Sequence, residues 1–325
     1  MSTYWSRPEP GIYGDGGPRH FLDVDDLGRA ELEAVLDVAA QFKHGHTAAG
    51  TATHFDGRTL GMLFQKPSTR TRVSFEAGMT RLGGHAIFLG ESDIQLGHGE
   101  PLRDTSRALS RYVDFLMARV FTHANAVELA AYADVPVVNG LTDDAHPCQT
   151  LADLLTIREH FDGFDDVTAA WVGDGNNVAQ SFVLGCALTD VDLRVATPAG
   201  YGIDDPVVSR ARDLGGDPTL TDDPVEAVAG ADVVYTDVWV SMGQEDERDV
   251  RLHAFDGFCV SDELLSHAPN ASVMHCLPAT RGEEITDDVI ESDRAIVWEQ
   301  AENRLHAQTG LLVWLDEQDD TPANE

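Results

Sequence analysis

The sequence predicts an α/β fold made of two doubly wound domains, each built on a parallel β-sheet. Short apolar segments of strand length alternate with longer segments of helical periodicity. This alternation is typical of a parallel sheet covered by helices on both faces. It occurs twice, before and after a long helical segment at residues 146–161. At 325 residues the chain is also long enough to form two cores of ordinary size.

The first half begins with a Gly- and Pro-rich stretch up to about residue 20, followed by a predicted helix over 26–42. Apolar runs then predict four strands, and the periodic segments between them predict three helices. The strands are expected at 59–64, 85–89, 115–120 and 135–139, and the helices at 69–82, 102–112 and 125–133.

The second half repeats the pattern, and its last helix is expected from about Ala301 to Leu315, before an acidic tail. Strands are predicted at 168–173, 192–197, 232–238, 272–276 and 295–298, and helices at 177–189, 206–213 and 224–229. No Ser- and Gly-rich linker separates the halves, so the helix over 146–161 is expected to join them. Ligands of such folds bind beyond the carboxyl ends of the strands.

The net charge of −34 is extreme, and lysine occurs only at Lys43 and Lys66. Such a surface repels nucleic acid and anionic lipid, so neither is expected as a partner. The carboxylates are spread along the whole chain rather than gathered in one tail. They predict a solvating surface of the kind expected of a halophilic protein that works in concentrated salt.

The four cysteines predict reduced thiols in a cytoplasmic protein. They stand at Cys148, Cys186, Cys259 and Cys276, without Cys-x-x-Cys spacing or a metal-ligand pattern with histidine. No apolar run reaches transmembrane length, and the N-terminus lacks the apolar core of a signal peptide. A soluble, cytoplasmic protein is therefore expected.

The first candidate site follows the predicted strand at 59–64, at Ser68-Thr69-Arg70-Thr71-Arg72. Ser68 suits the N-cap of the next helix. Arg70 and Arg72 then fall in its first turn, where the helix dipole disfavours positive charge. Hydroxyls, free backbone N–H groups and guanidinium groups at one helix start favour a bound phosphate. A capped helix with solvent-exposed arginines is the alternative, and the spacing alone favours neither.

The second candidate site is His146-Pro147-Cys148-Gln149, at the start of the long helix. Pro147 suits the first helical position, which makes His146 the N-cap and Gln149 the third residue. A histidine at this end of a helix tends to stay neutral and can donate a hydrogen bond to a carbonyl oxygen. The alternative is that Gln149 only closes a capping box. Because histidine is a poor N-cap, function is favoured.

A glycine-rich turn at residues 172–178 follows the strand that opens the second half. A dinucleotide-binding fingerprint requires a third small residue where Val178 stands, so this signal is weak. Asn177 is a plausible polar ligand-holder in this turn.

Two further candidate segments lie at the ends of predicted strands. Residues 237–243 offer the carboxylate of Asp237, the hydroxyl of Ser241 and the thioether of Met242, which suit a substrate with an ammonium group and methylenes. An ordinary loop is the alternative. Residues 274–278 contain Cys276, and a lone cysteine is more often a small hydrophobic residue than a nucleophile. Arg304, early in the last helix, again indicates an anion.

Taken together, these segments resemble the transcarbamoylase family, in the right order from about residue 20 to 316. The segments 68–72 and 146–149 are similar to its carbamoyl-phosphate loop and its His-Pro-x-Gln signature. The segments 237–243 and 275–278 are similar to motifs of the branch that uses ornithine. The resemblance implies that a carbamoyl group moves reversibly between carbamoyl phosphate and the side-chain amine of L-ornithine, with L-citrulline and phosphate as products.

The resemblance also implies a role for each matching residue. Carbamoyl phosphate would be bound by Ser68, Thr69, Arg70, Thr71, Gln95, Arg119, His146, Gln149, Cys276, Leu277 and Arg304, with Gln95 reaching a neighbouring subunit's site. Ornithine would be bound by Asn177, Asp237, Ser241 and Met242. Arg119, His146, Asp237 and Cys276 would take part in catalysis. No metal and no organic cofactor is required.

The resemblance further implies a carbamoyl-phosphate-binding domain at 20–148, an ornithine-binding domain at 149–300, and a C-terminal segment at 301–325 that returns as a helix to the first domain and ends in the acidic tail. The protein would be a homotrimer or an assembly of trimers. Both the synthesis of citrulline and its breakdown are compatible with one such site.

Three other functions compete with this interpretation. Another transcarbamoylase could use putrescine, an acylated ornithine or aspartate, although Asp237 and Met242 do not suit a second carboxylate. A nicotinamide-dependent dehydrogenase shares the doubly wound architecture but requires the fingerprint that is incomplete at 173–178. The third is a carbamoyl-phosphate-binding protein without turnover, which the complete set of arginines, Asp237 and Cys276 disfavours.

Overall fold

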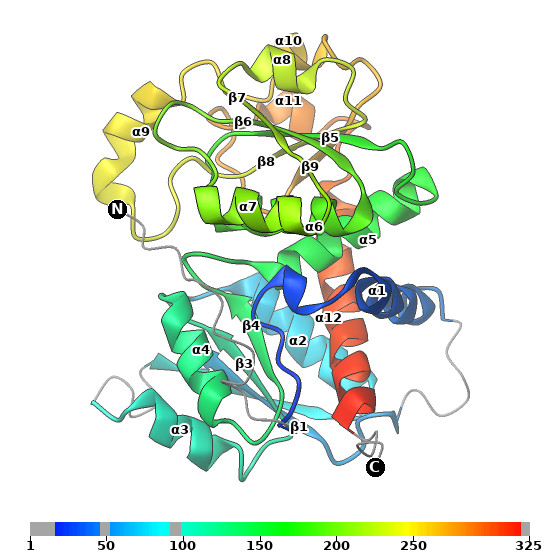
Figure 1. The fold of residues 1–325 in the computed structure, drawn as a ribbon, viewed down its shortest axis with the longest axis vertical. Coiled ribbons are helices and arrows are strands. Elements are labelled where there is room, and N and C mark those ends of the chain that lie inside the picture. Colours follow the sequence, from blue (N-terminus) through cyan, green and yellow to red (C-terminus); the bar gives the residue numbers. More distant parts are fainter. Residues whose placement is uncertain (1–16, 46–52, 92–98, 320–325) are drawn as a thin grey trace. The chain divides into compact units, whose positions relative to one another are not determined.

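The computed structural model describes residues 17–45, 53–91 and 99–319 (Figure 1). The chain divides into two compact units. The first unit contains the residues up to Leu155 and those from Arg304 onward, and the second unit contains Thr156–Asn303. The chain therefore enters the second unit within α5 (Pro147–Phe161) and leaves it within α12 (Val297–Asp319). The predicted long connecting helix and the return of the C-terminal helix are confirmed.

The first unit is built on a four-stranded parallel sheet in the order β2-β1-β3-β4. The strands are β1 (Thr59–Phe64), β2 (His85–Gly90), β3 (Phe115–Arg119) and β4 (Val137–Leu141). The helices are η1 (Val24–Asp26), α1 (Arg29–Lys43), α2 (Thr69–Arg81), α3 (Leu102–Leu109) and α4 (His123–Tyr132). Chain order reverses between β1 and β3, so the loops after these strands border the crevice where such sheets bind ligands.

The helices of the first unit cover both faces of its sheet. In Figure 1, α3 and α4 lie on one face, and α1, α2 and α12 lie on the other. Small residues let α12 approach its neighbours closely. A Cβ atom on Gly310 would lie 2.7 Å from the carbonyl oxygen of Val35 in α1, and one on Gly78 in α2 would lie 2.7 Å from Thr309 Oγ1. Larger side chains at these glycines would push α12 away, so the close packing depends on them.

The second unit has a five-stranded parallel sheet in the order β7-β6-β5-β8-β9. The strands are β5 (Thr168–Val172), β6 (Asp192–Ala196), β7 (Thr219–Thr221), β8 (Val233–Thr236) and β9 (Ser272–His275). The helices are α6 (Asn177–Thr189), α7 (Asp205–Asp213), α8 (Pro224–Val228), η5 (Glu245–Glu247), α9 (Arg248–Ala254), α10 (Asp262–Leu265) and α11 (Asp287–Ile290). Here the order reverses between β5 and β8. Figure 1 shows α6 and α7 on one face of this sheet and α8 and α10 on the other.

Two predictions near the end of the chain are wrong. Residues 295–298 do not form a strand, because Ala295 makes only one isolated bridge, to Val273, and α12 already begins at Val297. The final helix is therefore longer at both ends than the predicted 301–315. The short strand β7 was not predicted, because Thr219–Thr221 has three residues and little burial. Among the described residues, no helix is long and apolar enough to cross a membrane.

Candidate active site

The phosphate-loop segment of the first unit starts α2 at the reversal point between β1 and β3. Ser68 is the N-cap, as predicted, and its Oγ accepts a hydrogen bond from the Thr71 N–H at 3.2 Å. The Ser68 hydroxyl also donates to Thr71 Oγ1 at 3.0 Å. The loop is joined to β3, because the Gln65 N–H donates to the Arg119 carbonyl at 2.8 Å. The start of α2 thus lies beside the end of β3, and a helix start is where backbone N–H groups can bind an anion.

Arg304 joins α12 to the starts of α2 and α5. Arg304 is 4% exposed, and its guanidinium donates to Gln149 Oε1 at 2.6 Å and to Thr71 Oγ1 at 3.1 Å. The Gln149 amide in turn donates to Asp153 Oδ1 at 2.8 Å. The Gln149 side chain is therefore bonded to Arg304 and to Asp153. These two bonds differ from those of a capping box, which was the alternative role predicted for Gln149. A residue near the end of the chain thereby reaches the predicted phosphate loop.

His146 is buried just before α5, with 5% of its surface exposed. Burial lowers its pKa well below the ordinary value, and the charges of Arg304, Arg119 and Arg70 lower it further. The imidazole is therefore neutral, as the sequence predicted, although burial and three arginines are the causes rather than the helix dipole alone. A neutral ring can donate a hydrogen bond to a carbonyl oxygen among these cations.

Sequence reasoning missed Lys66, which is buried beside the phosphate loop. Its ammonium group forms an ion pair with Asp143 and lies 5.0 Å from the centre of the Phe121 ring. The ion pair connects the loop after β1 with the segment that leads into His146. The sequence offered a signal for Lys66, because it is one of only two lysines in this acidic chain and stands two positions before the segment at 68–72.

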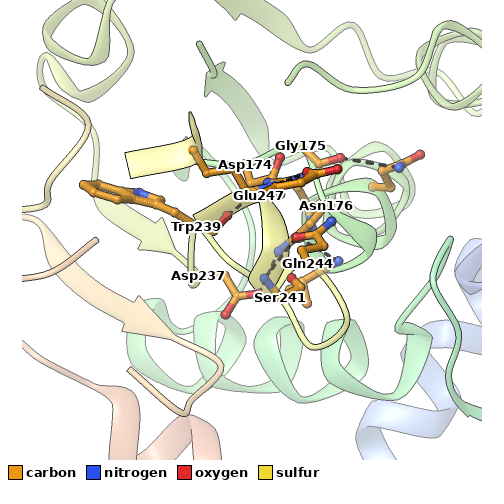
Figure 2. Close-up of polar contacts among 12 residues, drawn as sticks. Asp174, Gly175, Asn176, Asp237, Trp239, Ser241, Gln244 and Glu247 are labelled. Atoms are coloured by element: carbon orange, nitrogen blue, oxygen red, sulfur yellow. Dashed lines mark hydrogen bonds and ion pairs between the residues drawn. The ribbon is translucent and has the colours of Figure 1, made fainter. Parts of the chain in front are cut away.

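In the second unit, Asp237 lies at the end of β8 and is held by two neutral donors. Its Oδ1 accepts from the Cys276 thiol at 2.9 Å, and its Oδ2 accepts from the Asn176 amide at 2.8 Å. Asp237 is only 6% exposed. The loops after β5, β8 and β9 thus converge at the reversal point between β5 and β8. Figure 2 shows Asn176 and Asp237 in this group.

Asn176 was also missed, since the sequence pointed to its neighbour Asn177. Its Oδ1 caps α6 by accepting from the Val178 and Ala179 N–H groups, which leaves the amide N–H₂ to hold Asp237. Asn177 is the first residue of α6 and is half-buried. The preference for asparagine at an N-cap was the signal that could have identified Asn176.

The segment after β9 is organised by His275. The Leu277 N–H donates to His275 Nδ1 at 2.9 Å, so Nδ1 is an acceptor and Nε2 carries the proton that it shares with Glu284 Oε1 at 3.0 Å. Asp237, His275 and Cys276 each offer a possible metal ligand, and these atoms lie within 4.8 Å of one another. Both ring nitrogens of His275 are nevertheless already used within the protein.

The loop that follows Asp237 carries Ser241 and Met242. The Ser241 N–H donates to Gln244 Oε1 at 3.0 Å, a contact visible in Figure 2. Ser241 is half-buried, and Met242 is 48% exposed. The remaining predicted site residue, Gln95, lies outside the described residues.

Comparison with known proteins identifies the family of this chain. Residues 19–159 match the carbamoyl-P binding domain of aspartate/ornithine carbamoyltransferase, and residues 165–315 match the Asp/Orn binding domain. The chain belongs to the aspartate/ornithine carbamoyltransferase family. The resemblance predicted from the motifs is confirmed.

Relatives within this carbamoyltransferase family are similar over nearly their whole length. The chain is 64% identical to the ornithine carbamoyltransferase of Haloquadratum walsbyi over 91% of this chain and 97% of the relative. It is 55% identical to that of Methanoculleus marisnigri, over 91% and 96%. The solved ornithine carbamoyltransferase of Pyrococcus furiosus superposes with a TM-score of 0.86 at 50% identity, over 91% of this chain and 96% of that one.

Proposed function

We propose that this protein transfers the carbamoyl group of carbamoyl phosphate to the side-chain amine of L-ornithine, giving L-citrulline and phosphate in a reversible reaction. The relatives and the solved structure named above are all ornithine carbamoyltransferases. The observation that carries the choice of ornithine is the buried Asp237, held by Cys276 and Asn176 in the domain that binds the amine substrate. A carboxylate there suits an ammonium group and opposes the second carboxylate of aspartate.

In this proposal carbamoyl phosphate binds to the first unit. That unit corresponds to the predicted domain at 20–148, completed by the C-terminal helix. Its phosphate lies against the N–H groups and hydroxyls of Ser68, Thr69 and Thr71, where Arg70 supplies charge. Arg304 completes this cluster because it already donates to Thr71 and Gln149. Several donors are thus in place before the ligand arrives.

Arg119, Arg70 and His146 stabilise the charge that develops during transfer. The amine nitrogen attacks the carbonyl carbon, the carbonyl oxygen becomes negative, and the bond to phosphate then breaks with its electron pair on phosphate. Preorganised donors directed at that oxygen typically contribute about 10²–10³ in rate each. The neutral state of His146 suits this task, because the ring donates a hydrogen bond without adding a fourth cation.

The carbamoyl NH₂ group requires acceptors, and the segment at Cys276 and Leu277 offers them. The Leu277 N–H already donates to His275, so this segment contacts the carbamoyl group through its carbonyl oxygens. Asn177, Ser241 and Met242 contact ornithine together with Asp237, which orients the ammonium group. The ammonium group loses one proton before attack, because a protonated nitrogen has no lone pair to donate. The nitrogen loses a second proton once the C–N bond has formed, so that one proton ends on the departing phosphate and one is released to the solvent.

The protein acts as a homotrimer or a larger assembly of trimers in the cytoplasm. Exposed apolar side chains on α2 and β2, at Val73 and Ile87, support an interface on the first unit. The four free cysteines support a reducing compartment. Light scattering after size-exclusion chromatography in molar salt measures the assembly directly, and a monomeric mass would contradict it.

The test of function is carbamoylation in molar salt with ornithine, putrescine, N-acetylornithine and aspartate offered in parallel. Product formation with ornithine alone is expected. A preference for another amine would retain the carbamoyl-phosphate half of the proposal and overturn the ornithine half. Absence of product with every amine, from a protein with a cooperative unfolding transition, would overturn both.

A further inference from the structure

The second unit contains a buried ion pair whose arginine lies outside every predicted motif. Arg251, in α9, donates from Nη1 to Asp174 Oδ2 at 2.8 Å. Asp174 lies in the loop after β5, and both side chains are 8% exposed. Burial raises the pKa of Asp174 to about 6, even though Arg251 lowers it. Burying two charges is costly, and such pairs are weak evidence for stability. The contacts of this pair therefore call for another explanation.

The same guanidinium holds both ends of the loop that follows Asp237. Nη1 also donates to the Trp239 carbonyl at 3.0 Å, and Nε donates to Glu247 Oε2 at 3.1 Å. Trp239 precedes Ser241 and Met242, and Glu247 follows them. Figure 2 shows Asp174, Trp239 and Glu247 grouped on one side of this loop. Arg251 thus connects the start of the loop, its end and the neighbouring loop after β5.

The anchored points lie close in sequence to the groups that bind the amine. Asp174 stands two residues before Asn176, which holds Asp237, and Trp239 stands two residues after Asp237. Packing supports the same arrangement, since the Trp239 and Phe255 rings stack with centroids 5.6 Å apart, and the guanidinium lies 5.0 Å from the centre of the Tyr201 ring. Between its anchored ends, the loop makes short-range bonds such as Ser241 N–H to Gln244.

We propose that Arg251 is a positioning residue for ornithine: by holding Trp239 and Glu247 against Asp174, it fixes the loop that presents Ser241 and Met242 to the amino acid. This inference rests on the proposed function. Arginine suits the position because its planar fork bonds several acceptors at once, which the single ammonium group of lysine cannot reproduce. Without these bonds, ornithine has to order the loop as it binds, and its affinity falls.

The test compares Arg251→Met, Arg251→Lys and Asp174→Asn with wild type in steady-state assays. Arg251→Met is expected to raise the KM for ornithine about tenfold or more, and to leave the KM for carbamoyl phosphate within about twofold. Arg251→Lys should recover part of the loss, because it restores the charge beside Asp174 but not all three bonds. The matched control is Arg248→Met, since Arg248 is an exposed arginine of the same helix that pairs with Glu283. It should leave both KM values unchanged.

Hydrogen exchange provides a readout that does not depend on turnover. Amides of residues 240–247 should exchange faster in Arg251→Met, while those of β5 and β8 keep their protection. An unchanged KM for ornithine in folded Arg251→Met, or an equal rise for both substrates, would overturn the inference. If that variant does not fold, the same criteria apply to Arg251→Lys and Asp174→Asn. Wild type that does not turn over ornithine would instead overturn the proposed function.

Discussion

Each unit holds one buried charge of its predicted site between neutral partners, and the two charges are opposite in sign. In the first unit, the buried cation Arg304 is held by neutral acceptors on Gln149 and Thr71. In the second unit, a buried carboxylate is held by neutral donors, as Asp237 is by Asn176 and Cys276. Each cluster keeps its charge available for a ligand of opposite sign, because neutral partners do not cancel it.

The units also differ in how far their sites are formed without a ligand. Arg119, His146 and Arg304 are each no more than 5% exposed. On the amine side only Asp237 is comparably buried, while Met242 is 48% exposed. The comparison suggests that the phosphate side is preorganised, whereas part of the amine side is ordered by its substrate. Four predictions test this contrast.

The largest effect is expected for Asp237→Asn, which removes the charge that attracts the ammonium group. The kcat/KM for ornithine should fall about 10³-fold, while the KM for carbamoyl phosphate changes little. Steady-state assays with each substrate varied in turn measure both. Asp249→Asn is the control, since it removes an exposed carboxylate from α9. A fall in kcat/KM for carbamoyl phosphate alone would contradict the assignment of ornithine to the second unit.

Arg70→Ala should lower kcat/KM for carbamoyl phosphate about 10²-fold and leave the fold intact, because Arg70 is only half-buried. Arg72→Ala is the matched control from the same helix turn. Arg72 is exposed and donates to Glu76 at 2.9 Å, so its loss should have little effect. Equal losses in the two variants would remove the special role given to Arg70.

Thiol labelling compares how accessible and reactive a cysteine is in each unit. Burial raises the pKa of Cys148, in the first unit, to about 12. Cys276 is half-buried beside Asp237. Iodoacetamide at pH 8 should therefore modify Cys276 at least about 10²-fold faster than Cys148, because the thiolate is the reactive form. Peptide mass spectrometry over time measures the two rates, and ornithine with phosphate should slow only Cys276. Similar rates would show that the first unit is more open than its structure implies.

The smallest effect concerns pH and stability. The pKa of His146 is lowered in the folded state, so only the unfolded chain takes up this proton as the pH falls below about 6.5. Stability contributed by neutral His146 is complete above that pH and is lost below it, by up to about 1.4 kcal/mol per pH unit. Urea unfolding of wild type and His146→Asn between pH 7.5 and 5.5 tests this. A constant difference in free energy of unfolding would show that His146 titrates normally.

The sequence allowed most of the fold to be predicted, because the sheets consist of apolar runs and the helices have regular spacing. The prediction from sequence failed where long-range packing, rather than the local pattern, decides the structure. Residues 295–298 look like a strand, but α12 already begins at Val297, and β7 is too short to show a pattern.

The same limit applies to the sites. Ser68, His146, Asp237 and Cys276 were predicted because they stand in recognisable segments at strand ends. Arg251 was not, because its importance comes from Asp174, which is 77 positions away in the chain. Lys66 and Asn176 likewise act through partners that are distant in sequence. Contacts between residues this far apart produce no periodic pattern in the sequence, so a single sequence does not reveal them.

The position of Arg304 has a consequence for synthesis of the protein on the ribosome. Thr71 and Arg304 are hydrogen-bonded although 233 positions separate them. The second unit is one continuous segment and can fold as soon as it leaves the ribosome. The first unit is interrupted by it and lacks α12 until translation is almost complete. A nascent chain therefore cannot form the bonds of Arg304 to Thr71 and Gln149 early, and an mRNA truncated before codon 304 yields a product that lacks them.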